Sequence, residues 1–556
     1  MAEIVYEGNL SSSQMPFVST YKSRTVMVSG IDQNYIRGLA SGENGLIDGA
    51  SRGIPQIMYM HNVIPSTEGF QSVGFKSRVG AIGVPADIKD LILVKDVVSI
   101  GSEVACYLTW SKTANSFYSL TQNGAGVWSW AAVVTTGVID HNLTDRVTAA
   151  QVNGVTYLLL YFSAQQCRQY NQFANQLNTV ALLGTAAAFP AGLIKGNLSC
   201  FGYQLLWDEL TVAWSSTINP LDFVPSLITG AGYSRVEGAR GQIVAVIPHQ
   251  LGFIVYTTGN AIAGIYTGNA RFPFQFKEIT GVGGFPDYNS ATMNAADLIS
   301  DDSNTAAHFA YSSSGLQQIS ASQIINVLPY VTDFISGNYI EDFNTTTLLF
   351  TRTKLTNQLF KRVNVVADRY LVISYGTTAG VYTHALVYDI INKRMGKLKY
   401  THVACVTLAN VVTLGTGTST APSTGPRGSI GLLLNTGAIY TVDFDTVDTD
   451  VFPPDSCILI GRFQEIRSRL ITLERVEFEN VQLGAGLIAY AYTSLDGKNW
   501  TINDTTTAPT ALTLKSTADN LRMWSAHVSG INHAILLVGS FYANSFILRF
   551  HRNGRR

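Results

Sequence analysis

Short runs of β-branched and aromatic residues, separated by glycine-containing turns, recur along the whole 556-residue chain. Runs of this kind are typical of β-strands joined by hairpins. The strongest case is Val152-Asn-Gly-Val155, which is followed by the run Thr-Tyr-Leu-Leu-Leu-Tyr-Phe. Asn153 and Gly154 tolerate the positive φ that a two-residue hairpin turn requires. Similar turn signals occur at Asn123-Gly124, Gly259-Asn260, Ser314-Gly315, Asn435-Thr-Gly437 and Asp496-Gly497. The sequence therefore predicts an all-β protein.

The hairpins between residues 86 and 455 fall into comparable blocks of roughly 40–50 residues, the length typical of a four-stranded propeller blade. The blocks begin near Asp87, Asp140, Gly196, Arg240, Asn289, Phe360 and His402. We therefore predict a β-propeller of about six or seven blades over residues 86–455. The dipeptide Trp207-Asp208 is not repeated from block to block, so the pattern is not that of a WD40 array.

The segments before and after this region differ from it in composition and strand pattern. Residues 1–85 are rich in glycine and poor in strong strand patterns, which predicts an extended, β-rich N-terminal arm. In residues 456–556, Val476 and Phe478 alternate with charged residues, the pattern of a half-exposed strand. We predict a C-terminal β-sandwich there. A short helix is predicted over residues 322–335, because Ser322 can cap it and Pro329 limits it.

The chain is unusually poor in charge. Only 13% of its residues are charged and the net charge is −1, whereas soluble domains use about 25% charged residues. A surface built from Ser, Thr, Asn and Gln costs less to dehydrate than an ionic one. This composition favours a protein that contacts other subunits, and it lacks the strongly basic balance of a nucleic-acid-binding chain.

The sequence predicts no metal site and no cofactor. Its five cysteines (Cys106, Cys167, Cys200, Cys405 and Cys457) are scattered, which favours free buried thiols in a reducing compartment. The N-terminus lacks the basic and apolar regions of a signal peptide. No apolar stretch has the length of a membrane span, so we expect no membrane insertion.

One turn motif resembles the Asp-box of sialidases. It runs through Ser494, Asp496, Gly497 and Trp500. In such a turn the aspartate accepts backbone hydrogen bonds, glycine takes positive φ and tryptophan packs under the hairpin. The motif occurs once and falls outside the predicted propeller, so we interpret it as structural.

No catalytic motif is recognised, and we predict that the protein is not an enzyme. The sequence contains no HExxH helix, P-loop or G-x-S-x-G elbow. Neighbouring carboxylates, such as Asp208-Glu209, point to opposite faces of a strand. Carboxylates far apart in sequence are left open by this reasoning, since they can meet in space as a glycosidase pair.

A longer segment, Thr211–Gly232, resembles structural proteins of tailed bacteriophages, in which a strand ending in Trp-Ser is followed by Asn-Pro-x-x-Phe. The matching positions are Trp214, Ser215, Asn219, Pro220, Asp222 and Phe223. Three further stretches resemble the same proteins in the same order: Lys22–Gly30, Ile319–Ile335 and Phe546–Arg556. The family suggested is the tail nozzle, or tail-hub (tail tubular) protein, of short-tailed phages.

The resemblance implies a propeller on a β-rich platform, within a homohexameric ring. It implies a place in the virion tail, after assembly in the host cytoplasm, next to adaptor or portal-side proteins and tail fibre or spike proteins. Double-stranded DNA would pass through the ring as the genome is ejected. Two alternatives stay open: a propeller-type glycosidase, or a receptor-binding, tailspike-like protein, either acting on the host surface.

Overall fold

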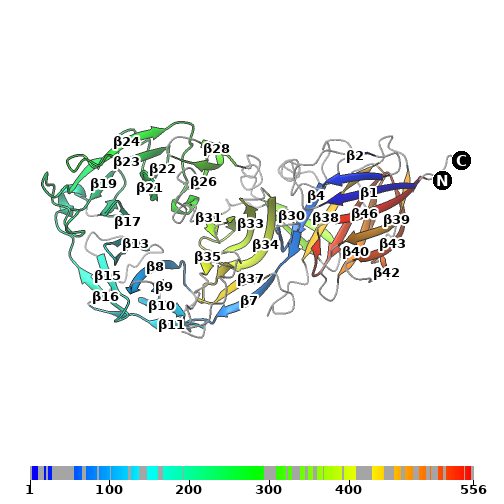
Figure 1. Ribbon diagram of the computed structural model, residues 1–556, viewed down its shortest axis with the longest axis horizontal. Helices are drawn as coiled ribbons and strands as arrows, with labels where there is room; N and C mark the ends of the chain where they lie inside the picture. The colour runs from blue at the N-terminus through cyan, green and yellow to red at the C-terminus, as the bar shows by residue number, and fades with distance from the viewer. Residues whose placement is uncertain are drawn as a thin grey trace.

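The fold is nearly all β, as predicted (Figure 1). It was obtained as a computed structural model, which describes residues 3–9, 18–19, 23–27, 56–65, 70–83, 87–99, 102–122, 127–136, 147–160, 167–191, 193–293, 308–320, 324–327, 339–344, 348–354, 360–366, 369–390, 394–408, 429–443, 456–464, 470–479, 487–495, 501–502, 511–516, 521–543 and 545–552. Within these residues the helical elements are α2 (Thr185–Ala188) and the 3₁₀ turn η1 (Tyr288–Ser290).

Seven sheets follow one another around a ring, seen on the left of Figure 1, and their strands pair antiparallel except for β12, which pairs with β16 in parallel. The first two contain β8 (Ile92–Ser99), β9 (Ser102–Ser111), β10 (Ser116–Gln122) and β11 (Trp128–Ala132), and then β12 (Val134–Thr135), β13 (Val147–Val152), β14 (Val155–Leu160), β15 (Cys167–Asn171) and β16 (Gln176–Val180). The third and fourth contain β17 (Gly196–Cys200), β18 (Tyr203–Trp207), β19 (Thr211–Trp214) and β20 (Gly232–Arg235), and then β21 (Ile243–His249), β22 (Gly252–Thr257), β23 (Ala261–Tyr266) and β24 (Phe274–Ile279).

The remaining three sheets complete the ring. The fifth contains β25 (Ala291–Met293), β26 (His308–Ser312), β27 (Gly315–Ile319) and β28 (Ile324–Asn326), and the sixth contains β31 (Phe360–Val366), β32 (Tyr370–Gly376), β33 (Tyr382–Asp389) and β34 (Arg394–His402). The seventh contains β35 (Ala404–Leu408), β36 (Ser429–Leu433) and β37 (Ile439–Asp443), to which β7 (Gly74–Val79) adds the outer strand. The ring is thus completed by a strand from the N-terminal segment.

Seven hydrophobic clusters hold the ring together, one between each pair of successive sheets. The cluster that joins the seventh sheet to the first contains Leu433 and Val79 from one and Tyr107 and Leu120 from the other. The sheets therefore stack face to face around a closed circle, the arrangement of blades in a β-propeller. Six of the predicted block starts lie at, or a few residues before, β8, β17, β21, β25, β31 and β35. The second sheet differs, because β12 begins at Val134, ahead of the predicted start at Asp140, and β13 begins at Val147.

The hairpin predicted at Asn153 and Gly154 is confirmed. Val152 pairs with Val155, and the two turn residues have φ of 51° and 77°. The predicted helix over residues 322–335 is wrong where the structure describes it, because Ile324–Asn326 forms β28 and pairs with β27. Pairing with the existing sheet edge outweighs the weak local helix signal. Residues 328–335 lie outside the described part of the chain.

Two further sheets form a sandwich on the right of Figure 1, where both termini lie. One contains β2 (Val18–Ser19), β3 (Ser23–Met27), β1 (Glu3–Asn9), β46 (Ser545–Arg552), β39 (Ile471–Glu479), β43 (Leu521–Gly530) and β42 (Thr513–Ser516). The other contains β4 (Gln56–His61), β38 (Cys457–Gln464), β44 (Asn532–Val538), β40 (Ile488–Ser494) and β41 (Thr501–Ile502). Their facing side chains, among them Ile458, Ile535, Val476 and Phe550, make one core.

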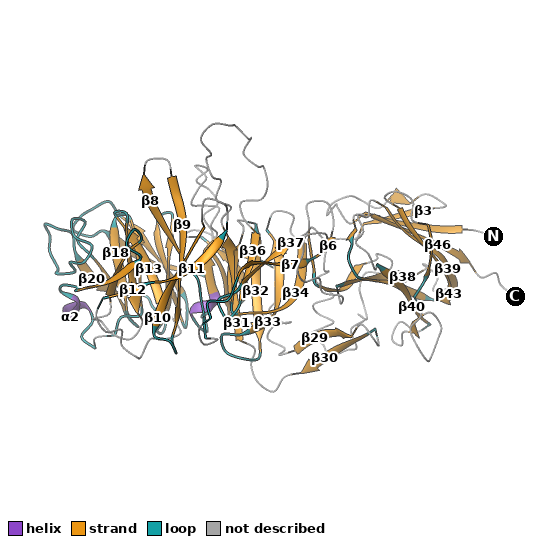
Figure 2. Ribbon diagram, turned by 90° about the horizontal axis from the view of Figure 1, so that it is seen from below, coloured by secondary structure: helices purple, strands orange, loops and turns teal. Residues whose placement is uncertain are grey.

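The sandwich and the ring are joined through the sixth sheet. β5 (Val63–Pro65), β6 (Phe70–Ser72) and β45 (Tyr542–Ala543) extend that sheet toward the sandwich. The hairpin of β29 (Tyr339–Asn344) and β30 (Leu349–Lys354) lies beneath this junction in Figure 2. The Tyr492 hydroxyl of the sandwich donates a hydrogen bond to the Leu348 carbonyl, next to this hairpin, at 2.6 Å. Strands from residues 1–85 thus join both the ring and the sandwich.

Glycine at position 154 should be required by backbone conformation alone. Its φ is +77°, yet an added Cβ would meet no atom within 4 Å. We expect Gly154→Ala to lower the free energy of unfolding by about 1–2 kcal/mol, the cost of left-handed backbone for an L-residue. Urea unfolding measures this. Gly80→Ala, at an equally open position without positive φ, is the matched control and should change stability by less than about 0.5 kcal/mol.

Candidate functional site

The segment that carries the phage-tail resemblance forms the loop between β19 and β20. Trp214 ends β19 and is buried against Phe274, with ring centroids 5.7 Å apart. Its indole Nε1 donates a hydrogen bond to the carbonyl oxygen of Gly230 at 2.9 Å. One side chain therefore fixes both ends of the loop, since Trp214 precedes it and Gly230 lies at its close.

The start of the loop is held by two serines. The Ser215 hydroxyl oxygen accepts a hydrogen bond from the Gln204 backbone N–H at 3.0 Å and donates to the Ser216 carbonyl. The Ser216 hydroxyl oxygen accepts from the backbone N–H of Ile218 at 3.1 Å. These bonds satisfy backbone groups that leave the sheet at this point, so the chain turns sharply after Trp214.

A proline turn follows. The Asp222 backbone N–H donates to the Asn219 carbonyl at 3.1 Å, and the Asn219 side-chain oxygen accepts from Leu221 N–H at 3.1 Å. Pro220 occupies the second position of this turn, where its fixed φ is favourable. The Asp222 carboxylate accepts a hydrogen bond from the Val224 backbone N–H at 3.0 Å, so this carboxylate stabilises the local turn.

Phe223 anchors the far side of the loop. Its side chain is fully buried in the cluster between the second and third sheets, beside Leu206 and Ala213. Its backbone N–H donates to the Leu183 carbonyl at 2.9 Å. The six signature residues thus lie together in one loop, where Trp214 and Phe223 act as two buried anchors on either side of the polar turn.

The loop that these anchors hold exposes large apolar side chains on both sides of Phe223. We call this the loop surface; it consists of Ile218, Val224, Leu227 and Ile228, with Phe272 from the neighbouring β23–β24 loop. Ile228 is 94% exposed, Ile218 79% and Leu227 69%. The two loops are adjacent, because a Cβ at Gly230 would lie 3.2 Å from the Ala270 carbonyl oxygen. A group of exposed apolar residues held by a fixed loop is typical of a protein-contact site.

Sequence reasoning missed the loop surface. It singled out the anchors Trp214 and Phe223 but not Ile218 or Ile228, whose apolar character is the same. The available signal was the composition of residues 215–231, which contain one charged residue, Asp222, and several large apolar ones. In a loop, where little is buried, large apolar side chains stay exposed to solvent unless another part of the chain or a partner covers them.

The second predicted motif lies only partly within the described residues. Ser494 ends β40, and its carbonyl accepts a hydrogen bond from the Ile531 N–H at 3.1 Å. Asp496, Gly497 and Trp500 are outside the described part of the chain. The strands on either side pair as a hairpin, with Thr493 opposite Thr501 in the sandwich.

A serine, a histidine and a cysteine that are distant in sequence meet between the sixth and seventh sheets. The Ser374 hydroxyl lies 2.8 Å from His402 Nε2 and 3.5 Å from Cys405 Sγ. His402 Nδ1 lies 2.7 Å from the Tyr400 carbonyl, to which it donates. Burial lowers the pKa of His402 to about 4 and raises that of Cys405 to about 11. These three groups are fully enclosed, and we interpret them as a structural contact.

A second buried histidine, His308, makes similar hydrogen bonds between the fourth and fifth sheets. His308 Nδ1 lies 2.7 Å from the Tyr256 hydroxyl, and Nε2 lies 2.8 Å from the Pro248 carbonyl. The carbonyl can only accept, so Nε2 carries the proton and Nδ1 accepts from tyrosine. Burial, with His249 nearby, lowers the pKa of His308 to about 3. The neutral form therefore dominates in the folded chain.

A buried carboxylate and a half-buried one in the ring pair with arginine. Asp389 lies 2.6 Å from the Arg369 guanidinium, and Asp90 lies 2.6 Å from that of Arg362. The neighbours Asp208 and Glu209 have separate partners: Asp208 accepts from backbone N–H groups of its turn, and Glu209 pairs with Lys195. Each of these acids has a structural partner.

The described residues show neither a cation-binding cluster nor a membrane-spanning helix. No group of three or more His, Cys, Asp or Glu side chains lies close enough together there to hold a metal ion. Among the helices of that same part, none has the length and apolar character to cross a bilayer.

Comparison with known proteins yields distant structural likenesses. No protein-family model and no curated protein matches the chain. The extracellular domain of the putative hybrid two component system BT4673 from B. thetaiotaomicron is 10% identical, with a TM-score of 0.36, covering 86% of this chain and 59% of that one. PorZ, a surface component of the type-IX secretion system of Porphyromonas gingivalis, is 10% identical, with a TM-score of 0.38, covering 87% and 63%.

A structure described as a glycoside hydrolase is also 10% identical, with a TM-score of 0.22, covering 85% of this chain and all of that one. The chain spans about three fifths of the length of the BT4673 domain and of PorZ. The likeness in all three cases is limited to a β-rich fold.

Truncating the first anchor should release the loop. We expect Trp214→Ala to lower the free energy of unfolding by about 3–5 kcal/mol, because it removes a buried ring and the hydrogen bond to Gly230. Limited proteolysis should then cut within residues 217–229. Trp214→Phe keeps much of the packing and should cost less. Resistance of the alanine variant to both urea and protease would contradict the anchoring role.

Acid should destabilise the fold through the two neutral histidines. The pKa values of His308 and His402 fall from an ordinary 6.5 to about 3 and about 4, so the unfolded chain binds more protons below pH ~6.5. The stabilisation by the two neutral histidines is complete above that pH and is lost as the pH falls through about 4 for His402 and about 3 for His308. At pH 4.5 the loss should be about 2–3 kcal/mol for each histidine.

Urea unfolding at several pH values measures this effect. His402→Gln should reduce the slope of stability against pH between 6.5 and 4.5, whatever it does to stability at neutral pH. His527→Asn, at an exposed histidine whose φ is 80°, is the control for a histidine outside the core. Equal slopes in wild type and His402→Gln would refute the assignment for that residue.

Proposed function

We propose that this protein is a virion structural protein, a subunit of the tail nozzle of a short-tailed bacteriophage. The loop surface carries the proposal, because a rigid apolar site of this size calls for a protein partner. The resemblance of Trp214–Phe223 and three further stretches to such proteins, and the low content of charge, also support it.

The proposed role is mechanical. Copies of the chain form a hexameric ring that holds the packaged genome and then conducts double-stranded DNA during ejection. The ring is attached to adaptor or portal-side proteins and carries tail fibres or spikes. A ring of stacked sheets has short, protected edges and resists deformation, which suits a wall unit. A nearly neutral chain limits both attraction to phosphate, which would stall the DNA, and repulsion.

The test is incorporation into particles. Deletion of the coding gene from the phage should leave particles that lose DNA or cannot infect, and the wild-type chain supplied in trans should restore them. Trp214→Ala should restore them poorly and Trp214→Phe better, because assembly requires the loop. Negative-stain images of purified particles should place the chain in a ring with a central hole.

Other outcomes would overturn the proposal. Absence of the chain from phage particles, or normal particles and normal thermal stability with Trp214→Ala, would do so. Release of sugar from host envelope by the purified chain would favour a glycosidase. A trimer that binds host cells would favour a receptor-binding protein.

A further inference from the structure

A second exposed apolar area lies on the first two sheets of the ring. We call it the edge surface; it consists of Val127, Ala131, Ala132, Val134 and Phe173. Phe173 is 76% exposed and Val134 61%. The segments are adjacent, since the Val134 N–H donates to the Asn175 carbonyl at 3.0 Å and the Asn175 side-chain amide donates to the Ala132 carbonyl at 2.9 Å.

Among the described residues that form the edge surface, none carries a charge and none is a proline. β11 is the end strand of its sheet, and residues 127–136 contain no charged side chain. The turn 171–175 beside it is also uncharged. End strands of soluble proteins are usually guarded by charge, proline or a covering segment, because an exposed apolar edge invites association.

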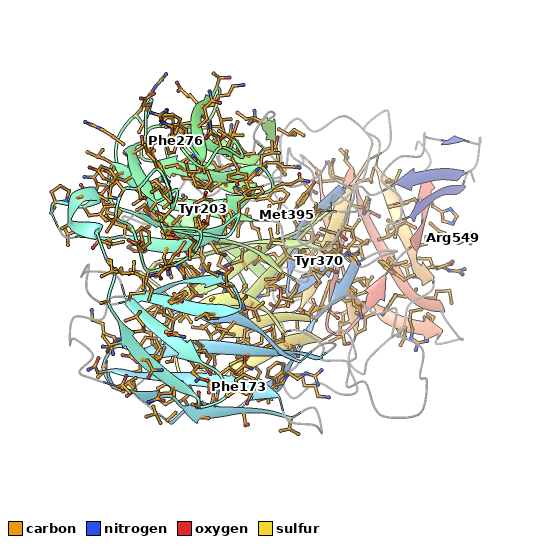
Figure 3. The ribbon with its side chains drawn as sticks, turned by 60° about the vertical axis from the view of Figure 1, so that its left-hand side comes forward. Phe173, Tyr203, Phe276, Tyr370, Met395 and Arg549 are labelled. Carbon is orange, nitrogen blue, oxygen red and sulfur yellow. The ribbon has the colours of Figure 1, made fainter. Side chains whose placement is uncertain are left out.

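The edge surface and the loop surface lie on different sheets. The edge surface belongs to the first and second sheets, and the loop surface to loops of the third and fourth. In Figure 3, Phe173 lies at the lower left among the cyan strands, whereas Tyr203 of the third sheet and Phe276 of the fourth lie above it. One chain therefore offers two separate apolar surfaces.

We propose that the edge surface of one copy of this chain binds the loop surface of the next copy. The loop surface has four side chains that are more than 60% exposed, the edge surface has three that are more than 55% exposed, and large apolar side chains of this kind form the buried core of protein interfaces. Both are uncharged apart from Asp222 and Arg271 at the rim of the loop surface, and with a net charge of −1 the copies repel each other little.

The contact is heterologous, because two different surfaces meet. It leaves one loop surface and one edge surface unfilled on every open chain of copies, so association continues until a ring closes. An isologous pair, loop surface on loop surface, would stop at a dimer and leave the edge strand bare. The inference rests on the proposed function only in taking the chain to be a subunit of an assembly.

Self-association of the purified full chain tests the proposal. In sedimentation velocity, wild type should form species larger than a dimer below about 100 µM. Ile228→Asp on the loop surface and Ala131→Asp on the edge surface should each weaken association at least about tenfold, because each places a charge in an apolar contact. Leu495→Asp, an exposed leucine of the sandwich, is the matched control and should behave as wild type.

Mixing the two variants separates the heterologous contact from the alternatives. Ile228→Asp keeps its edge surface and Ala131→Asp keeps its loop surface, so the mixture should form a one-to-one complex that grows no further. A wild type that stays monomeric, or a mixture that contains only monomers, would overturn the proposal.

Chemical crosslinking gives a reading that does not depend on the charged variants folding normally. The five native cysteines are buried, so thiols introduced at the surface react selectively. An Ala131→Cys, Ile228→Cys double variant treated with a flexible bismaleimide should give a ladder of covalent oligomers, and each single variant should stay monomeric. Dimers from Ile228→Cys alone would indicate an isologous contact and overturn the proposal.

Failure of this proposal and of the tail function can be told apart. If the ring forms through these two surfaces but no phage particle contains the chain, the contact stands and the tail function falls. If particles contain the chain but Ile228→Asp and Ala131→Asp associate as wild type, the tail function stands and the contact falls.

Discussion

The structure depends on a sixth sheet that is buried on both faces. Along β32, Leu371 and Ile373 pack against the fifth sheet and the sandwich, while Tyr370 and Val372 pack against the seventh sheet. Each such side chain contributes about 1.5–3 kcal/mol when fully buried. Since β5, β6 and β45 extend the same sheet, the ring and the sandwich share hydrogen bonds as well as a core. That double burial joins the ring and the sandwich through a common core.

Rigidity of the ring is what allows a loop to expose apolar side chains in a fixed arrangement. Trp214 and Phe223 insert into two different inter-sheet cores and hold the loop at both sides of its proline turn. The conformational entropy of ordering the loop is therefore already lost on folding, and Ile228 needs no rearrangement to contact a partner. A flexible loop of the same composition would bind less tightly, because the ordering cost would fall on the binding step.

Much of the fold could be predicted from local sequence, and much of the site could not. Asn153-Gly154 and the block starts were visible because turns and strand runs are encoded by neighbouring residues. The pairing of β7 with β37 was not, since more than 350 positions separate Phe75 from its partner Val442 and both read as ordinary strand residues. Phe223 is buried and Ile228 exposed although both are large and apolar, because only the neighbouring sheets decide which one is covered.

Low charge constrains how copies of this chain can recognise one another. Charged rims normally steer proteins together and fix their register, and like charges exclude wrong partners. Asp222 is used within its own turn, and residues 127–136 and 171–175 carry no charge, so the two apolar surfaces offer few ions for that purpose. Register between copies must then come from shape. Shape can specify a contact only if the surfaces do not deform. The loop meets that requirement, because two buried side chains anchor it to a closed ring of sheets.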